Sequence, residues 1–105
     1  MREFMFSDDL ADACVYLMAN CDASAIGSHV NVGTGTDVTI RELAEQICEV
    51  VGFEGELIFD SSKPDGSPRK LLNVGRLKEL GWSAGTSLRD GLEKTYEWYL
   101  KEHVR

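Results

Sequence analysis

Residues 31–44 read Asn-Val-Gly-Thr-Gly-Thr-Asp-Val-Thr-Ile-Arg-Glu-Leu-Ala, and they carry the clearest local structural signals of this 105-residue chain. Apolar and polar residues alternate over 29–32, which predicts a short strand, and the glycines that follow predict a tight turn. Thr39 and Glu42 then have the spacing of a capping box, in which each side chain bonds the backbone amide of the other residue. The stretch therefore predicts strand, turn and helix in succession, with Gly52 placed to end the helix in a left-handed conformation.

The segments on either side predict the rest of a small α/β domain with short strands. Further strands are expected at 2–6 and 56–59, and 71–74 forms either a third short strand or the lead into a helix. About four helices are expected, over 7–20, 40–51, 75–80 and 88–103. The length fits one domain, residues 1–105, with a modest core of its own.

The first expected helix has one apolar stripe. Its members fall at helical spacing: Leu10, Cys14, Leu17 and Met18. Ser7 is placed to cap the helix, and the two aspartates after it suit the positive end of the helix dipole. The helix should end near Asn20, followed by a loop over 21–28. Ser87 and Asp90 have the same capping spacing at the start of the last helix.

Charge and cysteine usage limit the classes of partner. The chain has 11 basic and 18 acidic residues and a net charge of −7, so no general attraction to nucleic acid or to an anionic membrane is expected. Three cysteines without Cys-x-x-Cys spacing argue against a disulfide framework or a zinc site. Reduced thiols, no visible signal peptide and no long apolar run together predict a cytoplasmic protein with no metal site.

The segment 60–70 is the most distinctive part of the chain. It holds both prolines and gathers Lys63, Arg69 and Lys70 within eight positions of an otherwise acidic sequence. A stiff basic loop of this kind is typical of an anion site. A solvated surface turn explains the same composition equally well, so composition alone leaves both interpretations open.

The chain shows no cofactor motif and no catalytic constellation. A dinucleotide fingerprint beginning at Gly33 needs a third glycine where this sequence has Val38. No tyrosine is followed four residues later by lysine, the spacing that short-chain dehydrogenases need. We therefore expect neither catalytic nor cofactor-binding residues here, and we interpret the glycines as turn residues.

Several motifs resemble those of a known family. Arg-Glu-Phe followed by Asp-Asp over 2–9, together with 31–44, resembles elements of extended short-chain dehydrogenases and nucleotide-sugar epimerases. Lys-Pro-Asp-Gly-Ser-Pro-Arg-Lys at 63–70, followed by Leu-Gly-Trp at 80–82, is sharper. It resembles the C-terminal part of the GDP-L-fucose synthase family, also called GDP-4-keto-6-deoxymannose epimerase-reductases, and the likeness extends over nearly the whole chain.

The resemblance implies a C-terminal substrate-binding lobe, part of a larger enzyme that performs 3,5-epimerisation and NADPH-dependent reduction of a 4-keto sugar bound to GDP. In that family a larger N-terminal Rossmann part, absent from these residues, holds NADP(H) and the catalytic side chains. By position, Arg2, Asp65 and Lys70 match substrate-binding positions, and Arg69 is a plausible neighbour with weaker support. The isolated lobe is expected to be inactive.

Two alternatives from other classes stay open. One is a stand-alone module that binds a nucleotide-sugar, and the other is a protein-interaction domain without a ligand. The expected partners of a lobe are a GDP-sugar and the missing Rossmann domain. Because a lobe separated from its partner exposes apolar surface, self-association is also expected.

Overall fold

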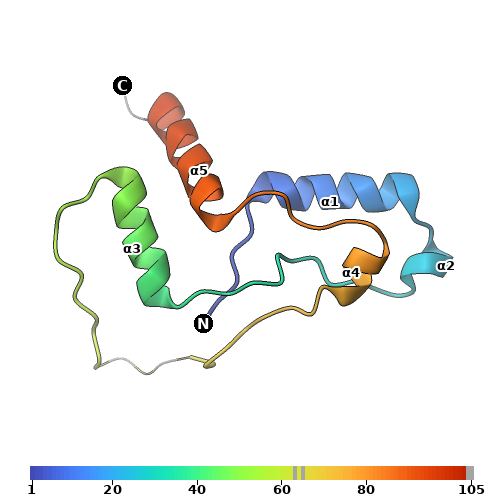
Figure 1. Ribbon diagram of the computed structural model, residues 1–105, viewed down its shortest axis with the longest axis horizontal. Coiled ribbons are helices and arrows are strands. Elements are labelled where there is room, and N and C mark those ends of the chain that lie inside the picture. Colours follow the sequence, from blue (N-terminus) through green and yellow to red (C-terminus); the bar gives the residue numbers. More distant parts are fainter. Residues whose placement is uncertain (63, 65, 104–105) are drawn as a thin grey trace.

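The computed structural model describes residues 1–62, 64 and 66–103. Five helices account for its regular structure: α1 Ser7–Asn20, α2 Ala23–Ile26, α3 Ile40–Val51, α4 Gly75–Glu79 and α5 Leu88–His103. Long extended segments join them, and the ribbon is open and flat (Figure 1). The principal-axis extents are 51 × 38 × 17 Å, and the radius of gyration is 16.8 Å, against about 13 Å for a compact chain of this length.

The predicted short strands are wrong for the described residues. The extended segments at 2–6, 29–32, 56–59 and 71–74 form no β-ladder, and only two isolated bridges occur. Both bridges involve Arg2, which pairs with Val38 in antiparallel sense and with Lys70 in parallel sense. A strand needs a neighbour along its length. Of these segments only 2–6 makes a bridge, at Arg2, and both bridge partners lie outside the other three segments.

The first helix packs mainly through its polar stripe, and one member of its apolar stripe, Leu17, packs against the core. Its apolar stripe is largely exposed, with Leu10 at 47% and Met18 at 86%. The helix instead turns its polar stripe towards residues 80–86. There Asp9 accepts hydrogen bonds from the amide and hydroxyl of Thr86. Asp12 accepts one from the indole N–H of Trp82, and the Tyr16 hydroxyl donates one to the carbonyl of Leu80.

The core of the described residues is small and lies beneath this polar face. It consists of Ala13, Val74, Leu77 and Trp82. Leu77 is 1% exposed, and it belongs to α4, which was predicted at 75–80. Gly81, with φ of 97°, turns the chain out of α4, in the left-handed region that favours glycine. The buried set is therefore a link between α1 and α4 rather than a domain-wide core.

The predicted caps are confirmed for two helices. The Thr39 hydroxyl accepts from the Glu42 amide at 3.0 Å, and the Ser87 hydroxyl accepts from the Asp90 amide at 3.1 Å. The second half of the first box differs, because the Glu42 carboxylate accepts from the Thr39 hydroxyl rather than from the amide. Gly52 ends α3 at φ 74° and ψ 29°, as predicted.

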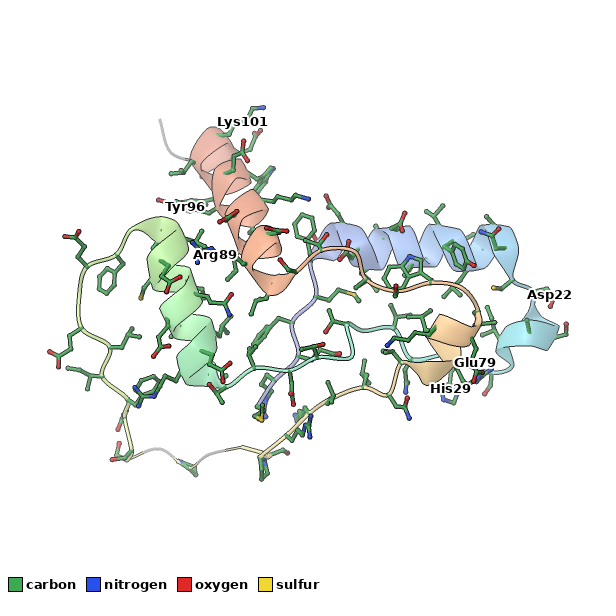
Figure 2. The ribbon with its side chains drawn as sticks, viewed as in Figure 1. Asp22, His29, Glu79, Arg89, Tyr96 and Lys101 are labelled. Carbon is green, nitrogen blue, oxygen red and sulfur yellow. The ribbon has the colours of Figure 1, made fainter. Side chains whose placement is uncertain are left out.

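Two helix starts differ from the sequence prediction. Phe6, not Ser7, holds the N-cap position of α1, and it makes no side-chain cap bond. The loop expected at 21–28 contains α2, whose start is capped by Asp22 accepting from the amide of Ala25 (Figure 2). Bonds from Ser24 and the Ala25 amide lower the pKa of Asp22. Four residues are too few for a periodic pattern, so only the cap could have indicated α2.

The α3 and α5 helices form the one helix–helix contact of appreciable size in the described chain. Arg89 joins them at the surface by pairing with Glu49 on α3 and Glu93 on α5 (Figure 2). These two carboxylates raise the pKa of Arg89. All three side chains are more than two-fifths exposed, so these ion pairs contribute little to stability.

Candidate functional site

Arg2 is the point where three separate segments meet. Its amide donates to the carbonyl of Val38 and its carbonyl accepts from the amide of Val38, both at 2.9 Å. On the other side, the Lys70 amide donates to the carbonyl of Met1 at 3.2 Å. The first residues therefore lie between the segment entering α3 and the end of the basic segment 60–70. Arg2 and Lys70, predicted together from positions 68 residues apart, are brought into adjacent positions.

The side chain of Arg2 reaches further along the basic segment. Its Nη1 donates to the carbonyl of Ser67 at 2.7 Å and to that of Met1 at 2.8 Å. A Cβ at Gly66 would lie 3.0 Å from Nη2 of Arg2, so this backbone passes close to the guanidinium. The Met1 amino group also donates to the carbonyl of Pro68 at 2.6 Å. The side chain of Arg2 and the amino group of Met1 thus bind the basic segment through the backbone carbonyls of Ser67 and Pro68.

Arg69 is held by a partner that the sequence did not indicate. Its Nε donates to Oδ2 of Asp37 at 2.7 Å and its Nη2 to Oδ1 at 3.4 Å. The Asp37 side chain is only 6% exposed, whereas that of Arg69 is 60% exposed. Position 37 follows a glycine-rich turn, where an acidic residue is ordinary, so sequence alone gave no sign of this pair.

Of the remaining two predicted site residues, one is exposed and the other lies outside the described residues. Lys70 is exposed beside its bridge to Arg2. Asp65, a predicted substrate-binding residue, and Lys63 lie outside the described residues. At the start of the segment, Asp60 accepts from the amide and hydroxyl of Ser62, and these bonds lower the pKa of Asp60.

The turn at 33–35 is occupied by an internal carboxylate. Oε2 of Glu3 accepts from the Gly35 amide at 2.6 Å and from the Thr34 hydroxyl at 3.2 Å. The nearest helix begins only at Ile40, so no helix N-terminus opens at this turn. Because the turn amide already binds a carboxylate, this turn does not fit the pyrophosphate of a dinucleotide.

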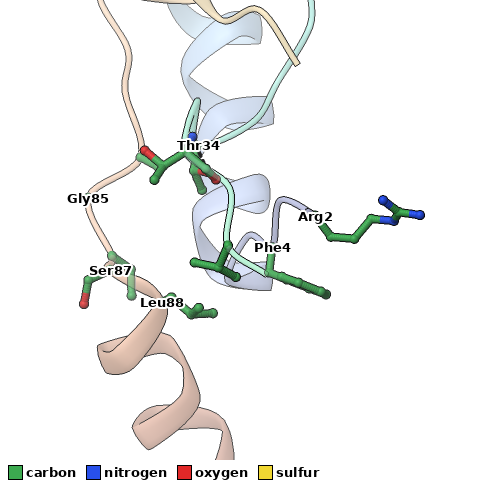
Figure 3. A pocket seen from close by; sticks show the side chains of 10 residues that line it. Arg2, Phe4, Thr34, Gly85, Ser87 and Leu88 are labelled. Carbon is green, nitrogen blue, oxygen red and sulfur yellow. Dashed lines mark hydrogen bonds between the residues drawn. The ribbon is translucent and has the colours of Figure 1, made fainter. Parts of the chain in front are cut away.

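A cavity of about 430 Å³ opens beside Arg2. It is lined by Arg2, Phe4, Thr34, Thr36, Val38 and residues 84–88. Figure 3 shows Thr34 and the segment Gly85–Leu88 on one side, with the guanidinium of Arg2 extending away from Ser87. Hydroxyls and a small apolar surface line the hollow, while Arg69 and Lys70 lie beyond it. The sequence identified Arg2 but not the 84–88 wall, whose Thr86 is held by Asp9.

The described residues show neither a metal cluster nor a membrane span. No group of three or more His, Cys, Asp or Glu side chains among them is placed to hold a metal ion. None of the helices in this part of the chain is both long and apolar enough to cross a bilayer. The three cysteines are free thiols.

Comparison with curated proteins finds relatives along the full chain, although no family model matches it. GDP-L-fucose synthase 1 of Arabidopsis thaliana is 58% identical over 101 residues, which are 96% of this chain and 30% of the relative. GDP-L-fucose synthase of Escherichia coli is 50% identical over 111 residues, covering the whole chain and 35% of the relative. The chain thus spans about a third of the length of these relatives, and it matches their C-terminal region.

Solved structures give the same result. A GDP-6-OMe-4-keto-L-xylo-heptose reductase of Campylobacter jejuni superposes with a TM-score of 0.90 at 39% identity, over 97% of this chain and 31% of that one. A GDP-mannoheptose C4 reductase from the same organism, solved with NADP bound, gives 0.82 at 42% identity, over 93% and 31%. The predicted resemblance is confirmed: these 105 residues are similar in sequence and in fold to the C-terminal part of such proteins.

Proposed function

We propose that this chain is the GDP-sugar-binding portion of a GDP-L-fucose synthase, with GDP-4-keto-6-deoxymannose as substrate. The observation that carries the proposal is the backbone pairing of Arg2 with Lys70, which makes two basic residues neighbours, one of them lining an open cavity. In an acidic chain, such a gathering of positive groups suits a diphosphate. The similarity to GDP-L-fucose synthases supports the choice of nucleotide.

The chemistry of the whole enzyme is part of the same proposal. It epimerises the sugar at carbons 3 and 5 and then reduces the 4-keto group with NADPH. Since the 33–35 turn does not fit a pyrophosphate, we assign NADP(H) and the catalytic side chains to a Rossmann part outside these residues. The lobe alone binds and does not turn over.

The roles of the site residues follow from their positions. Lys70 is exposed and contributes a point charge to a phosphate. Arg2 shares its guanidinium between two backbone carbonyls and the ligand. A guanidinium has five N–H donors, and the two hydrogen bonds from Nη1 go to the carbonyls of Met1 and Ser67. Asp65 lies on the substrate side by its match to the family motif.

An exposed apolar surface on α1 supports two further parts of the proposal, contact with a Rossmann part and self-association of the isolated chain. The outer stripe of α1, which we define as Leu10, Cys14, Val15 and Met18, lies open to solvent. We assign it to contact with the Rossmann part in the cytoplasmic full-length enzyme. When the 105 residues are produced alone, the same stripe drives self-association.

Calorimetry with GDP on the 105-residue chain tests the proposal. Lys70→Ala should weaken binding about tenfold, the scale of one charge-assisted contact of roughly 1.4 kcal/mol. Because Lys70 makes its hydrogen bond to Met1 through its backbone amide and its side chain is exposed, the truncation should leave the fold intact. Lys101→Ala, which removes the same charge near the end of α5, is the matched control and should bind as the parent does.

Absence of heat with GDP would contradict the proposal and favour a protein-interaction domain. A second experiment replaces the matching C-terminal region of the E. coli GDP-L-fucose synthase with this chain. Restored epimerase-reductase activity supports an enzyme lobe. GDP binding without any active chimera would instead favour a stand-alone module.

A further inference from the structure

We infer that Asp37 and Arg69 form a clasp that positions the basic segment, so that Arg69 acts through Asp37 and not on the phosphates. The inference rests on the proposed function, which it deepens by separating a positioning pair from the groups that touch the ligand. It assigns a role to Asp37, for which sequence gave no indication. The pair lies beside the backbone bridges of Arg2.

Asp37 and Arg69 are joined by two hydrogen bonds. Two guanidinium nitrogens face two carboxylate oxygens, at 2.7 and 3.4 Å. The carboxylate side is 6% exposed, and a nearly buried carboxylate is costly without its cation. Arg69 therefore has an electrostatic reason to stay on Asp37. Its charge is largely neutralised there, which leaves little of it for a phosphate.

The clasp lies across the meeting point of the three segments. Asp37 directly precedes Val38, one bridge partner of Arg2, and Arg69 directly precedes Lys70, the other partner. Neighbouring side chains of an extended chain point to opposite faces. Arg69 held on Asp37 therefore leaves Lys70 on the face that it shares with its bridge partner. The two outer segments are tied together on one face while the basic groups are presented on the other.

The two possible roles of Arg69 predict opposite effects of one substitution. If Arg69 binds phosphate directly, Asp37→Asn frees it, and GDP affinity stays equal or rises. If the pair is a clasp, Asp37→Asn releases the segment, which must then be ordered on binding. Ordering a few side chains on binding costs conformational entropy, which should weaken GDP affinity by about five- to tenfold.

The test is GDP calorimetry on the full 105-residue chain with Asp37→Asn, Arg69→Gln and the double variant. The clasp predicts the same five- to tenfold weakening in all three, since two residues acting as one unit are not additive. Arg69→Lys, which keeps the charge and one contact, should recover part of the loss. Glu45→Gln, on the exposed face of α3, is the charge-matched control and should have no effect.

Unchanged or tighter binding by Asp37→Asn overturns the inference, as does a double variant that is weaker by the product of the two single effects. Trypsin gives a readout without ligand, because it cleaves after Arg69 and Lys70. The clasp predicts faster cleavage there in Asp37→Asn than in the parent or in Glu45→Gln, and equal rates overturn it. If the parent does not bind GDP, the proposed function fails, while this protease comparison still decides whether the clasp exists.

Discussion

At the scale of single residues, the space around Gly33 shows how closely the turn is built on Glu3. Gly33 is buried, and a Cβ there would lie 2.7 Å from Oε1 and 2.9 Å from Oε2 of Glu3. The carboxylate would have to move, and its bonds to Gly35 and Thr34 would weaken. The sequence explains Gly33 by the geometry of the turn. The structure shows that a glycine also leaves space there for the carboxylate of Glu3.

Gly33→Ala should therefore lower the free energy of unfolding by about 1–3 kcal/mol, the scale of a hydrogen bond to a charged group. Urea titration followed by circular dichroism measures it. Gly85→Ala is the matched control, since a Cβ there meets nothing within 4 Å, and it should cost nothing. In a Glu3→Ala background the Gly33 effect should vanish. A full cost in that background would rule out the steric explanation.

The residues of the site differ in how far sequence could predict them. Arg2 and Lys70 came from a motif resemblance, and their proximity needed the fold. Asp37 and Glu3 were not predictable, because an isolated acid carries no periodic or spacing signal. Their importance comes from partners more than 30 residues away, Arg69 and Gly35.

At the scale of elements, helices with a local signal were predicted well and the strands were not. The α3 and α5 helices begin at the predicted residues. Each start could be predicted because the capping residue and its partner lie within four consecutive residues. The expected strands depended on partners that the described chain does not supply. For α1 the pattern located an apolar stripe, of which Leu17 packs against the core while Leu10, Cys14 and Met18 are exposed. Hydrophobic spacing identifies a face and not what covers it.

Thr39→Ala should destabilise the chain by about 1 kcal/mol, because the Glu42 amide loses its acceptor. Thermal melting followed at the helical circular dichroism band measures this. Ser83→Ala, an exposed hydroxyl outside any helix, is the control for removal of a polar side chain. If the two substitutions lowered the melting temperature equally, the cap would have no special role.

At the scale of the whole molecule, the chain exposes more surface than a compact protein of the same mass. Its accessible area is 7837 Å², whereas a compact monomer of 11.7 kDa exposes about 5,900 Å². The difference exceeds the roughly 800 Å² that each partner contributes to a standard interface. An excess of this size, with four buried core residues among those that the structure describes, supports the proposal that this lobe packs against another surface.

Because of this excess of exposed surface, we expect the isolated chain to associate with itself. The outer stripe of α1 should bring copies together, and Met18→Glu should shift the chain towards monomer by placing a charge within that contact. Ile58→Glu is matched in exposure, 84% against 86% for Met18, but lies outside the stripe. Sedimentation velocity at increasing concentration should show association in the parent and in Ile58→Glu, and less in Met18→Glu. A parent that stays monomeric throughout would mean that the exposed stripe needs no cover, and the assignment of α1 to a domain contact would lose its support.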